Sequence, residues 1–82
     1  MAENVELLAR ITADPKVMVG KPTIRGLRIT LEQILRALAN GVSEAELLAE
    51  YPELEPADIR AALLYACELV SEEQVFPIRA AV

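Results

Sequence analysis

Apolar residues recur with a helical period after residue 30, between polar positions that mark where helices begin and end. Four of them follow one another at i, i+3, i+4 and i+7 and would share one helix face: Leu31, Ile34, Leu35 and Leu38. Thr30 and Gln33 have the spacing of a capping box, in which each side chain satisfies a backbone N–H of the other residue. Gly41 stands where a left-handed C-cap is favoured. The pattern predicts a first helix over residues 31–40.

Two more helices are predicted after the first. Ser43 and Glu46 form a second capping-box pattern, and the short helix that they begin ends before Pro52. Pro56 suits the first position of a helix, because its missing N–H would have no partner there. The third helix is expected to span residues 56–73. Three helices joined by tight turns have the outline of a helix-turn-helix, although that outline alone does not imply a function.

The third helix carries no charge between Arg60 and Glu68, and apolar side chains surround it there. A helix that is apolar on all sides has to be covered on more than one of them. We expect the first two helices to cover one side and a second copy of the chain to cover the other, with Leu64 and Tyr65 in the dimer interface. Cys67, the only cysteine, is expected to be a buried and unreactive thiol in the same helix.

The N-terminal region predicts a short helix and a β-hairpin. Residues 3–10 could form two helical turns that pack on the core or fray, and Asp14-Pro15 would end them. Residues 17–19 predict a strand, Gly20-Lys21 suits a tight type II′ turn, and residues 23–24 would be the returning strand. Because two short strands are marginally stable alone, such a hairpin has to pack on the helices or on another subunit.

The length predicts a single domain. It would comprise an N-terminal arm and hairpin over residues 1–30, a three-helix core over 31–73 and a tail over 74–82. Hydrophobic residues make up 54% of the chain, which is a high share for so small a domain and favours self-association. The chain has no run of about 18 apolar residues and no leader-like segment, so we expect a soluble, cytoplasmic protein without membrane contact.

Charge is divided unevenly along the chain, whose formal net charge is -5. Residues 15–36 hold five basic residues and one acid, whereas residues 43–73 hold nine acids and one arginine. A polyanion would therefore meet the N-terminal third, where Lys21, Arg25 and Arg28 are the candidate phosphate contacts. In the alternative interpretation, these cations pair with the acidic helices of the same molecule. The residues alone leave both interpretations open.

Catalytic and metal-binding signals are weak. Histidine, the commonest general base and metal ligand, is absent. Glu46 and Glu50 would share a helix face, but no phosphate loop or second ligand set accompanies them, so they suit a solvated surface. The start of the third helix offers Glu53, Glu55 and Asp58 against one arginine, which disfavours base reading in a DNA groove. We therefore expect no enzyme, no cofactor, no metal and no small-molecule substrate.

One segment points to a protein family more specifically than the rest of the sequence does. It is Gly20-Lys21-Pro22-Thr23-Ile24-Arg25-Gly26-Leu27-Arg28-Ile29-Thr30, with the preceding Asp14-Pro15. Together with Gly41, Tyr51-Pro52 and the stretch from Asp58-Ile59 to Tyr65-Ala66, it resembles the domain-of-unknown-function family four-three-three (DUF433) over residues 11–66. The resemblance implies a mainly α fold, a three-helix homeodomain-like (helix-turn-helix-type) bundle preceded by a small N-terminal β-hairpin. Leu27 and Glu55 depart from the threonine and the capping threonine or serine that the family usually has there.

The same resemblance implies a role, because many members of the family look like antitoxins that pair with a PIN-like ribonuclease toxin. Our first hypothesis is a homodimeric antitoxin of a type II toxin-antitoxin pair, which masks such a toxin and contacts operator DNA through Lys21, Arg25 and Arg28. The C-terminal tail would engage the toxin, with Phe76 as an apolar anchor and Arg79 reaching a carboxylate cluster. The competing hypothesis is a non-catalytic dimeric interaction module without nucleic-acid binding.

Overall fold

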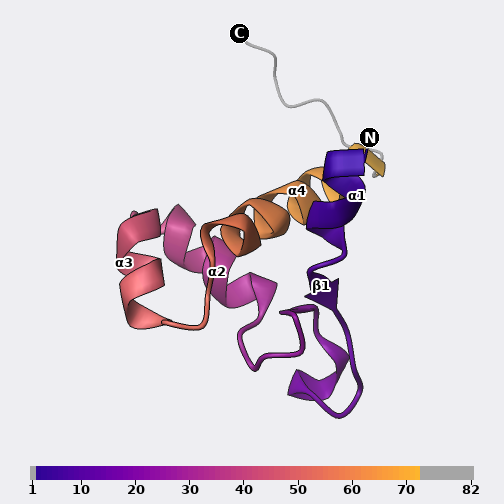
Figure 1. The fold of residues 1–82 in the computed structure, drawn as a ribbon, viewed down its shortest axis with the longest axis horizontal. Helices are drawn as coiled ribbons and strands as arrows, with labels where there is room; N and C mark the ends of the chain where they lie inside the picture. The colour runs from indigo at the N-terminus through magenta and orange to yellow at the C-terminus, as the bar shows by residue number, and fades with distance from the viewer. Residues whose placement is uncertain (1, 73–82) are drawn as a thin grey trace, which may run out of the picture.

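Helices make up most of the computed structural model, which describes residues 2–72 (Figure 1). The elements in chain order are α1 (Ala2–Leu8), β1 (Ile11–Thr12), the 3-10 turn η1 (Met18–Gly20), β2 (Thr23–Ile24), α2 (Leu31–Ala39), α3 (Glu44–Glu50) and α4 (Pro56–Glu72). The other three helices all pack against α4, the longest one. The predicted mainly α fold with a small antiparallel strand pair near the N-terminus is therefore confirmed. Among the described helices, none is both long and apolar enough to cross a membrane.

Both predicted capping boxes are present and explain where α2 and α3 begin. The Thr30 hydroxyl accepts the Gln33 N–H at 3.0 Å, and the Gln33 side chain accepts the Thr30 N–H at 2.9 Å. Ser43 and Glu46 repeat the exchange at 3.1 and 2.8 Å. Gly41 follows α2 with a φ of +93°, the left-handed conformation that ends a helix at little cost for glycine. Local side-chain chemistry thus sets these helix ends.

We expect Thr30→Ala to lower the free energy of unfolding by about 1 kcal/mol, because it removes the oxygen that accepts the Gln33 N–H, one of the N–H groups in the first turn of α2 that have no partner within the helix. Thr30 is only 3% exposed, so water does not readily replace the lost acceptor. Urea denaturation monitored by circular dichroism measures the change. Thr30→Ser keeps the hydroxyl and serves as the control; equal losses in the two variants would show that the lost methyl group, and not the cap, accounts for the effect.

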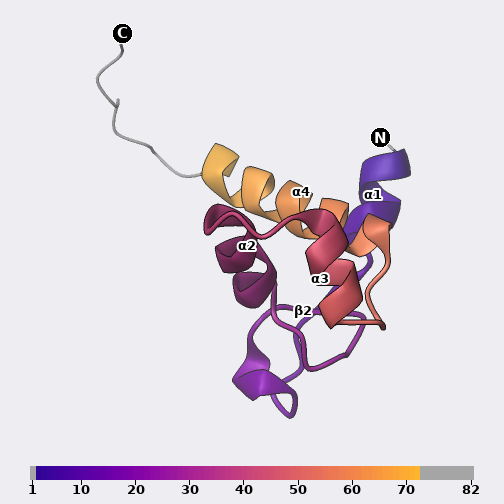
Figure 2. The same cartoon turned by 90° about the vertical axis from the view of Figure 1, so that its left-hand side faces the viewer.

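The hydrophobic core joins β2 to α2, α3 and α4. The isoleucines at 24, 34 and 59 are completely buried, and Leu47 of α3 is 3% exposed. The full cluster is Ile24, Ile29, Leu31, Ile34, Leu47, Leu54, Ile59 and Ala62. Figure 2 shows α2 and α3 together on one side of α4, in agreement with the predicted packing of these three helices. The core also includes β2, so the N-terminal segment is part of the folded body.

The predicted strand over residues 17–19 is wrong, whereas the strand over residues 23–24 is confirmed as β2. The partner of β2 is β1, which is antiparallel to it and pairs Ile11 with Ile24. Met18 and Val19 have φ values of 50° and 56°, a left-handed backbone that no strand contains. The strand pair is therefore closed by a long loop over residues 13–22, and not by a two-residue turn.

Asp14 explains why the chain turns where a strand was predicted. Its carboxylate accepts the Lys16 N–H at 2.9 Å, and its carbonyl oxygen accepts the Val17 N–H at 2.8 Å. These two bonds fold the chain back directly after Pro15 and use N–H groups that a sheet would need. The hydrophobic run after Asp14 therefore becomes part of a loop.

Candidate binding site along helix α4

The C-terminal half of α4 presents apolar side chains to solvent. Leu63, Leu69 and Val70 are 44%, 50% and 59% exposed, whereas Ile59 and Ala62, nearer the start of the helix, are completely buried. We call this exposed surface the α4 strip and define it by Leu63, Ala66, Cys67, Leu69 and Val70. Contiguous apolar surface of this kind on a small protein marks an interaction site.

Cys67 corrects one expectation, because its side chain is exposed and not buried. The prediction rested on the apolar residues around Cys67, which were expected to be covered by the first two helices on one side and by a second copy of the chain on the other. α4 continues beyond the core cluster, whose last member on this helix is Ala62, and its partly covered neighbours extend only to Tyr65. Within the described residues, nothing covers the thiol.

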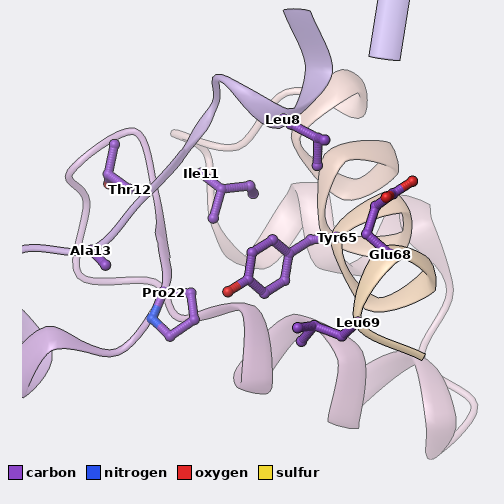
Figure 3. Close-up of a pocket in the computed structure, with 8 residues that line it drawn as sticks. All are labelled: Leu8, Ile11, Thr12, Ala13, Pro22, Tyr65, Glu68 and Leu69. Carbon is purple, nitrogen blue, oxygen red and sulfur yellow. The ribbon is translucent and has the colours of Figure 1, made fainter. Parts of the chain in front are cut away.

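A groove lies between α4 and the N-terminal segment, with a volume of about 430 Å³ (Figure 3). Figure 3 shows the Tyr65 ring at its centre, between Ile11 and Leu69, with the hydroxyl group directed toward Pro22. We call it the Tyr65 groove; its lining residues are Leu8, Ile11, Thr12, Ala13, Pro22, Tyr65, Glu68 and Leu69. Apart from Glu68 at the rim, the lining is uncharged and mostly apolar, which suits an apolar side chain of a partner.

A second hollow of about 490 Å³ lies on the α2 side of the same helix. It shares Pro22, Tyr65 and Leu69 with the Tyr65 groove, so the two hollows flank one ridge. Of the two residues predicted for a dimer interface, Tyr65 therefore lies at the centre of the accessible apolar surface. Leu64 is half-buried and lines neither hollow.

The basic side chains that were predicted to contact phosphate do not form one shared basic surface. Arg25 donates two hydrogen bonds to the Asp58 carboxylate, from Nε to Oδ1 at 3.1 Å and from Nη2 to Oδ2 at 2.9 Å. Arg10 reaches the same carboxylate at 2.9 Å and Glu55 at 2.8 Å. Asp58 also accepts the Glu55 N–H at 2.8 Å, which completes half of a capping box at the start of α4. Asp58, Arg10, Arg25 and Glu55 together form what we call the Asp58 cluster.

The electrostatics of this cluster favour its charged form. Burial by itself raises the pKa of Asp58, but the hydrogen bonds from Arg25, the Glu55 N–H and Arg10 outweigh burial and hold the pKa below its usual value. The pKa values of both arginines are raised, mainly by the hydrogen bonds to Glu55 and Asp58 for Arg10 and to Asp58 for Arg25. The carboxylate is therefore ionised at neutral pH and fastens two N-terminal segments to the start of α4.

Lys21 and Arg28, the other two predicted phosphate contacts, are exposed. Lys21 pairs with Glu32 of α2 at 3.2 Å, and Glu32 also pairs with Arg36. Arg28 makes no ion pair within residues 2–72. Pairing with the acidic helices of the same molecule, which the sequence left open, thus occurs for Arg25 through Asp58. Lys21 pairs instead with Glu32, outside the acidic residues 43–73, and phosphate binding stays a prediction.

The sequence analysis predicted neither the role of Arg10 nor the Tyr65 groove. Arg10 carries no local signal, because its partner Asp58 is 48 positions away. The sequence contained one signal for a structural role of Asp58. It lies three residues after Glu55, and that spacing suits a capping box at the start of α4. Phe76 and Arg79, the predicted toxin contacts, lie outside the described residues. Among residues 2–72, no group of three metal-ligating side chains comes together.

Two of the comparisons with known proteins name the same family. The model of the family described as "Protein of unknown function (DUF433)" matches residues 11–66. The uncharacterized protein y4eO of Sinorhizobium fredii is 32% identical over 56 residues, which are 68% of this chain and only 25% of that relative. The crystal structure of a DUF433 member protein from Anabaena variabilis is similar with a TM-score of 0.71 and 30% identity, over 87% of this chain and 71% of that one. This chain therefore belongs to the DUF433 family.

Proposed function

We propose that this protein is a cytoplasmic, non-catalytic binding protein, the homodimeric antitoxin of a type II toxin-antitoxin pair. In this role it neutralises a PIN-like ribonuclease toxin and contacts operator DNA. The observation that carries the proposal is the α4 strip, whose apolar side chains stand in solvent beside two hollows. The antitoxin role itself follows from the family resemblance, and the surface supports a protein that acts by binding.

A second copy of the chain is the partner that we assign to the α4 strip. Complete burial of a leucine or valine side chain contributes about 1.5–3 kcal/mol. Leu63, Leu69 and Val70 are each about half exposed, so covering them recovers a large part of that free energy. An isologous dimer covers the strip on both copies at once and thus doubles the gain.

The distribution of charge assigns protein binding and nucleic-acid binding to different parts of the chain. Residues 43–73, which include α3 and α4, hold nine acids and one arginine, so this part of the chain repels phosphate. Operator contact is therefore proposed for the N-terminal segment alone. There, Lys16 and Arg28 are exposed and make no ion pair with any described residue.

The alternative, a dimeric interaction module without nucleic-acid binding, is favoured by one observation. Arg25 and Lys21, two of the three candidate phosphate contacts, are already paired with Asp58 and Glu32. A gel shift at low salt with the upstream DNA of its gene separates the two functions. Loss of the shift in Arg28→Glu supports operator binding, and no shift with the wild type supports the alternative.

We expect Leu69→Asp to weaken the dimer at least about tenfold, because it places a charge at the edge of the apolar strip where Leu69 lines both hollows. Light scattering coupled to size-exclusion chromatography over a dilution series measures the change. Ala49→Asp on the exposed face of α3 is the matched control and keeps the dimer. Equal dimer affinity in the two variants would rule out the α4 strip as the interface.

The antitoxin role is tested by co-expression with the tagged product of the adjacent gene. We expect the two proteins to purify as a complex and the tagged product to lose its ribonuclease activity in that complex. Free ribonuclease and separate elution would refute the antitoxin role. That result would leave the dimer proposal unaffected, because light scattering measures the dimer independently.

A further inference from the structure

The loop over residues 13–22, which we call the spur, is an ordered projection. Its ends are held together by the pairing of Thr12 with Thr23 in the β1–β2 ladder. Inside the spur, the Gly20 N–H donates to the Val17 carbonyl and the Lys21 N–H to the Met18 carbonyl, each at 3.1 Å. In both Figure 1 and Figure 2 it points away from α4. Compact loops with closed ends are frequent carriers of function.

Val19 at the tip of the spur belongs neither to the core cluster nor to the partly buried residues packed against it. It is 90% exposed, the highest value among the exposed large hydrophobic residues of the described chain. Its φ of 56° is a left-handed conformation that is costly for a β-branched residue, and Met18 before it has a φ of 50°. Such strain is found where function requires it. The backbone of the spur is thus arranged to hold an apolar side chain in solvent.

The spur and the Tyr65 groove are complementary in chemistry. Val19 is an apolar knob with Lys16 and Lys21 on either side in the sequence. The groove is an apolar hollow with Glu68 at its rim, and neither Glu68 nor Lys16 makes an ion pair with a side chain of residues 4–71. Its volume of about 430 Å³ easily admits a valine side chain.

The spur of a chain does not fill the groove of that same chain. Ala13 and Pro22, the two ends of the spur, form part of the wall of the groove, while the tip points away from α4. Because each chain carries both the knob and the groove, a two-fold axis allows two copies to exchange them reciprocally, and the assembly closes as a dimer.

We propose that a second copy of this chain fills the Tyr65 groove with its spur, so that Val19 of each copy packs on Tyr65 and Leu69 of the other. Lys16 then faces Glu68 of the second copy. The proposal rests on the homodimer of the proposed function and specifies its contacts. The spur is a dimerisation element, and its apolar tip is buried only when two copies meet.

Substitutions at Val19 test the insertion in the full-length chain. Val19→Asp is expected to weaken the dimer at least about tenfold in a light-scattering dilution series. Val19→Gly removes the knob and also relieves the left-handed strain, so it weakens the dimer without lowering the melting temperature of the monomer, which is measured at concentrations below the dissociation constant of the dimer. A structural role for Val19 would instead lower the melting temperature in both variants. Val19→Thr keeps the shape and is the conservative control.

A charge exchange tests the orientation of the two copies. Lys16→Glu and Glu68→Lys are each expected to weaken the dimer by roughly two- to fivefold, and the double variant to restore it, because the pair is re-formed with opposite signs. A double variant as weak as the single variants would overturn the proposed contact. Assemblies that grow with concentration would overturn the reciprocal exchange.

Two results distinguish failure of this inference from failure of the proposed dimer. A dimer that Leu69→Asp disrupts but Val19→Asp leaves intact would overturn the spur insertion and keep α4 as the interface. A wild-type chain that is monomeric at all concentrations would overturn both.

Discussion

Asp58→Asn is expected to lower the free energy of unfolding by about 3 kcal/mol. All four groups that contact the carboxylate are donors: Nη1 of Arg10, Nε and Nη2 of Arg25, and the Glu55 N–H. An asparagine side chain would direct its own N–H₂ group at two of these donors. Arg10 and Arg25 are 30% and 35% exposed and can partly recover water, which places the loss at the lower end of the range for broken buried pairs.

Urea denaturation at neutral pH measures this loss. Glu50→Gln, at an exposed glutamate of α3, is the matched control and should change stability by less than about 0.5 kcal/mol. A loss in Asp58→Asn no larger than that of the control would mean that the Asp58 cluster does not hold the fold together.

The same variant changes the pH dependence of stability. The pKa of Asp58 is lowered in the folded state, so the unfolded chain binds the proton more readily. The stabilisation is fully present above the unfolded pKa of about 3.9 and is lost as the pH falls through the lower folded value. Wild-type protein should therefore lose stability in acid below about pH 4, and Asp58→Asn should lose less. Glu32 and Glu46 also have lowered pKa values, so the acid sensitivity is reduced and not abolished.

Arg25→Met is expected to lower the free energy of unfolding by about 2 kcal/mol, whereas Arg28→Met should change it by less than about 0.5 kcal/mol. Loss of Arg25 removes two of the four hydrogen bonds to a carboxylate that is completely buried. Methionine preserves the packing of the side-chain stem, so the comparison isolates the charge and its hydrogen bonds. Arg28 makes no ion pair in the described part of the chain.

A double-mutant cycle with Asp58→Asn assigns the effect to this contact, because two residues that interact directly lose less together than the sum of their single losses. Additive losses would contradict the assigned role of Arg25. The different expected effects of Arg25 and Arg28 on stability also guide the DNA experiment. If an Arg25 variant loses the gel shift, the cause is either a lost phosphate contact or a weakened fold. Arg28→Glu provides the cleaner test of phosphate contact.

The helices were predictable because their signals are local. Thr30 with Gln33 and Ser43 with Glu46 act across three positions. The observed end of α2 differs from the predicted one by one residue, and α4 is helical from Pro56 to the last described residue, Glu72. The apolar period of α2 identified its buried face, and Ile34 is indeed completely buried. Propensity, capping and periodicity agree in this part of the chain, which is the condition for a reliable prediction.

The strand pair could not be predicted in the same way. Residues 17–19 have an apolar pattern that is typical of a strand, but the hydrogen bonds of Asp14 turn the chain before the pairing can form. The true partner of β2, at Ile11–Thr12, is two residues long and has no periodicity to detect. Short strands are defined by the surface on which they pack, and that surface is formed by distant helices.

By itself, the sequence determined the number, order and ends of the helices in the bundle, because capping and helical periodicity act over a few residues. Only the tertiary structure decided that Arg25 stabilises the fold through Asp58 and that Arg10, 48 positions away in the sequence, binds the same carboxylate. It also decided that Cys67 is exposed in the single chain. The Tyr65 groove likewise exists only because α1, β1 and α4 meet. Side chains far apart in the chain acquire their partners through packing, which no local pattern encodes.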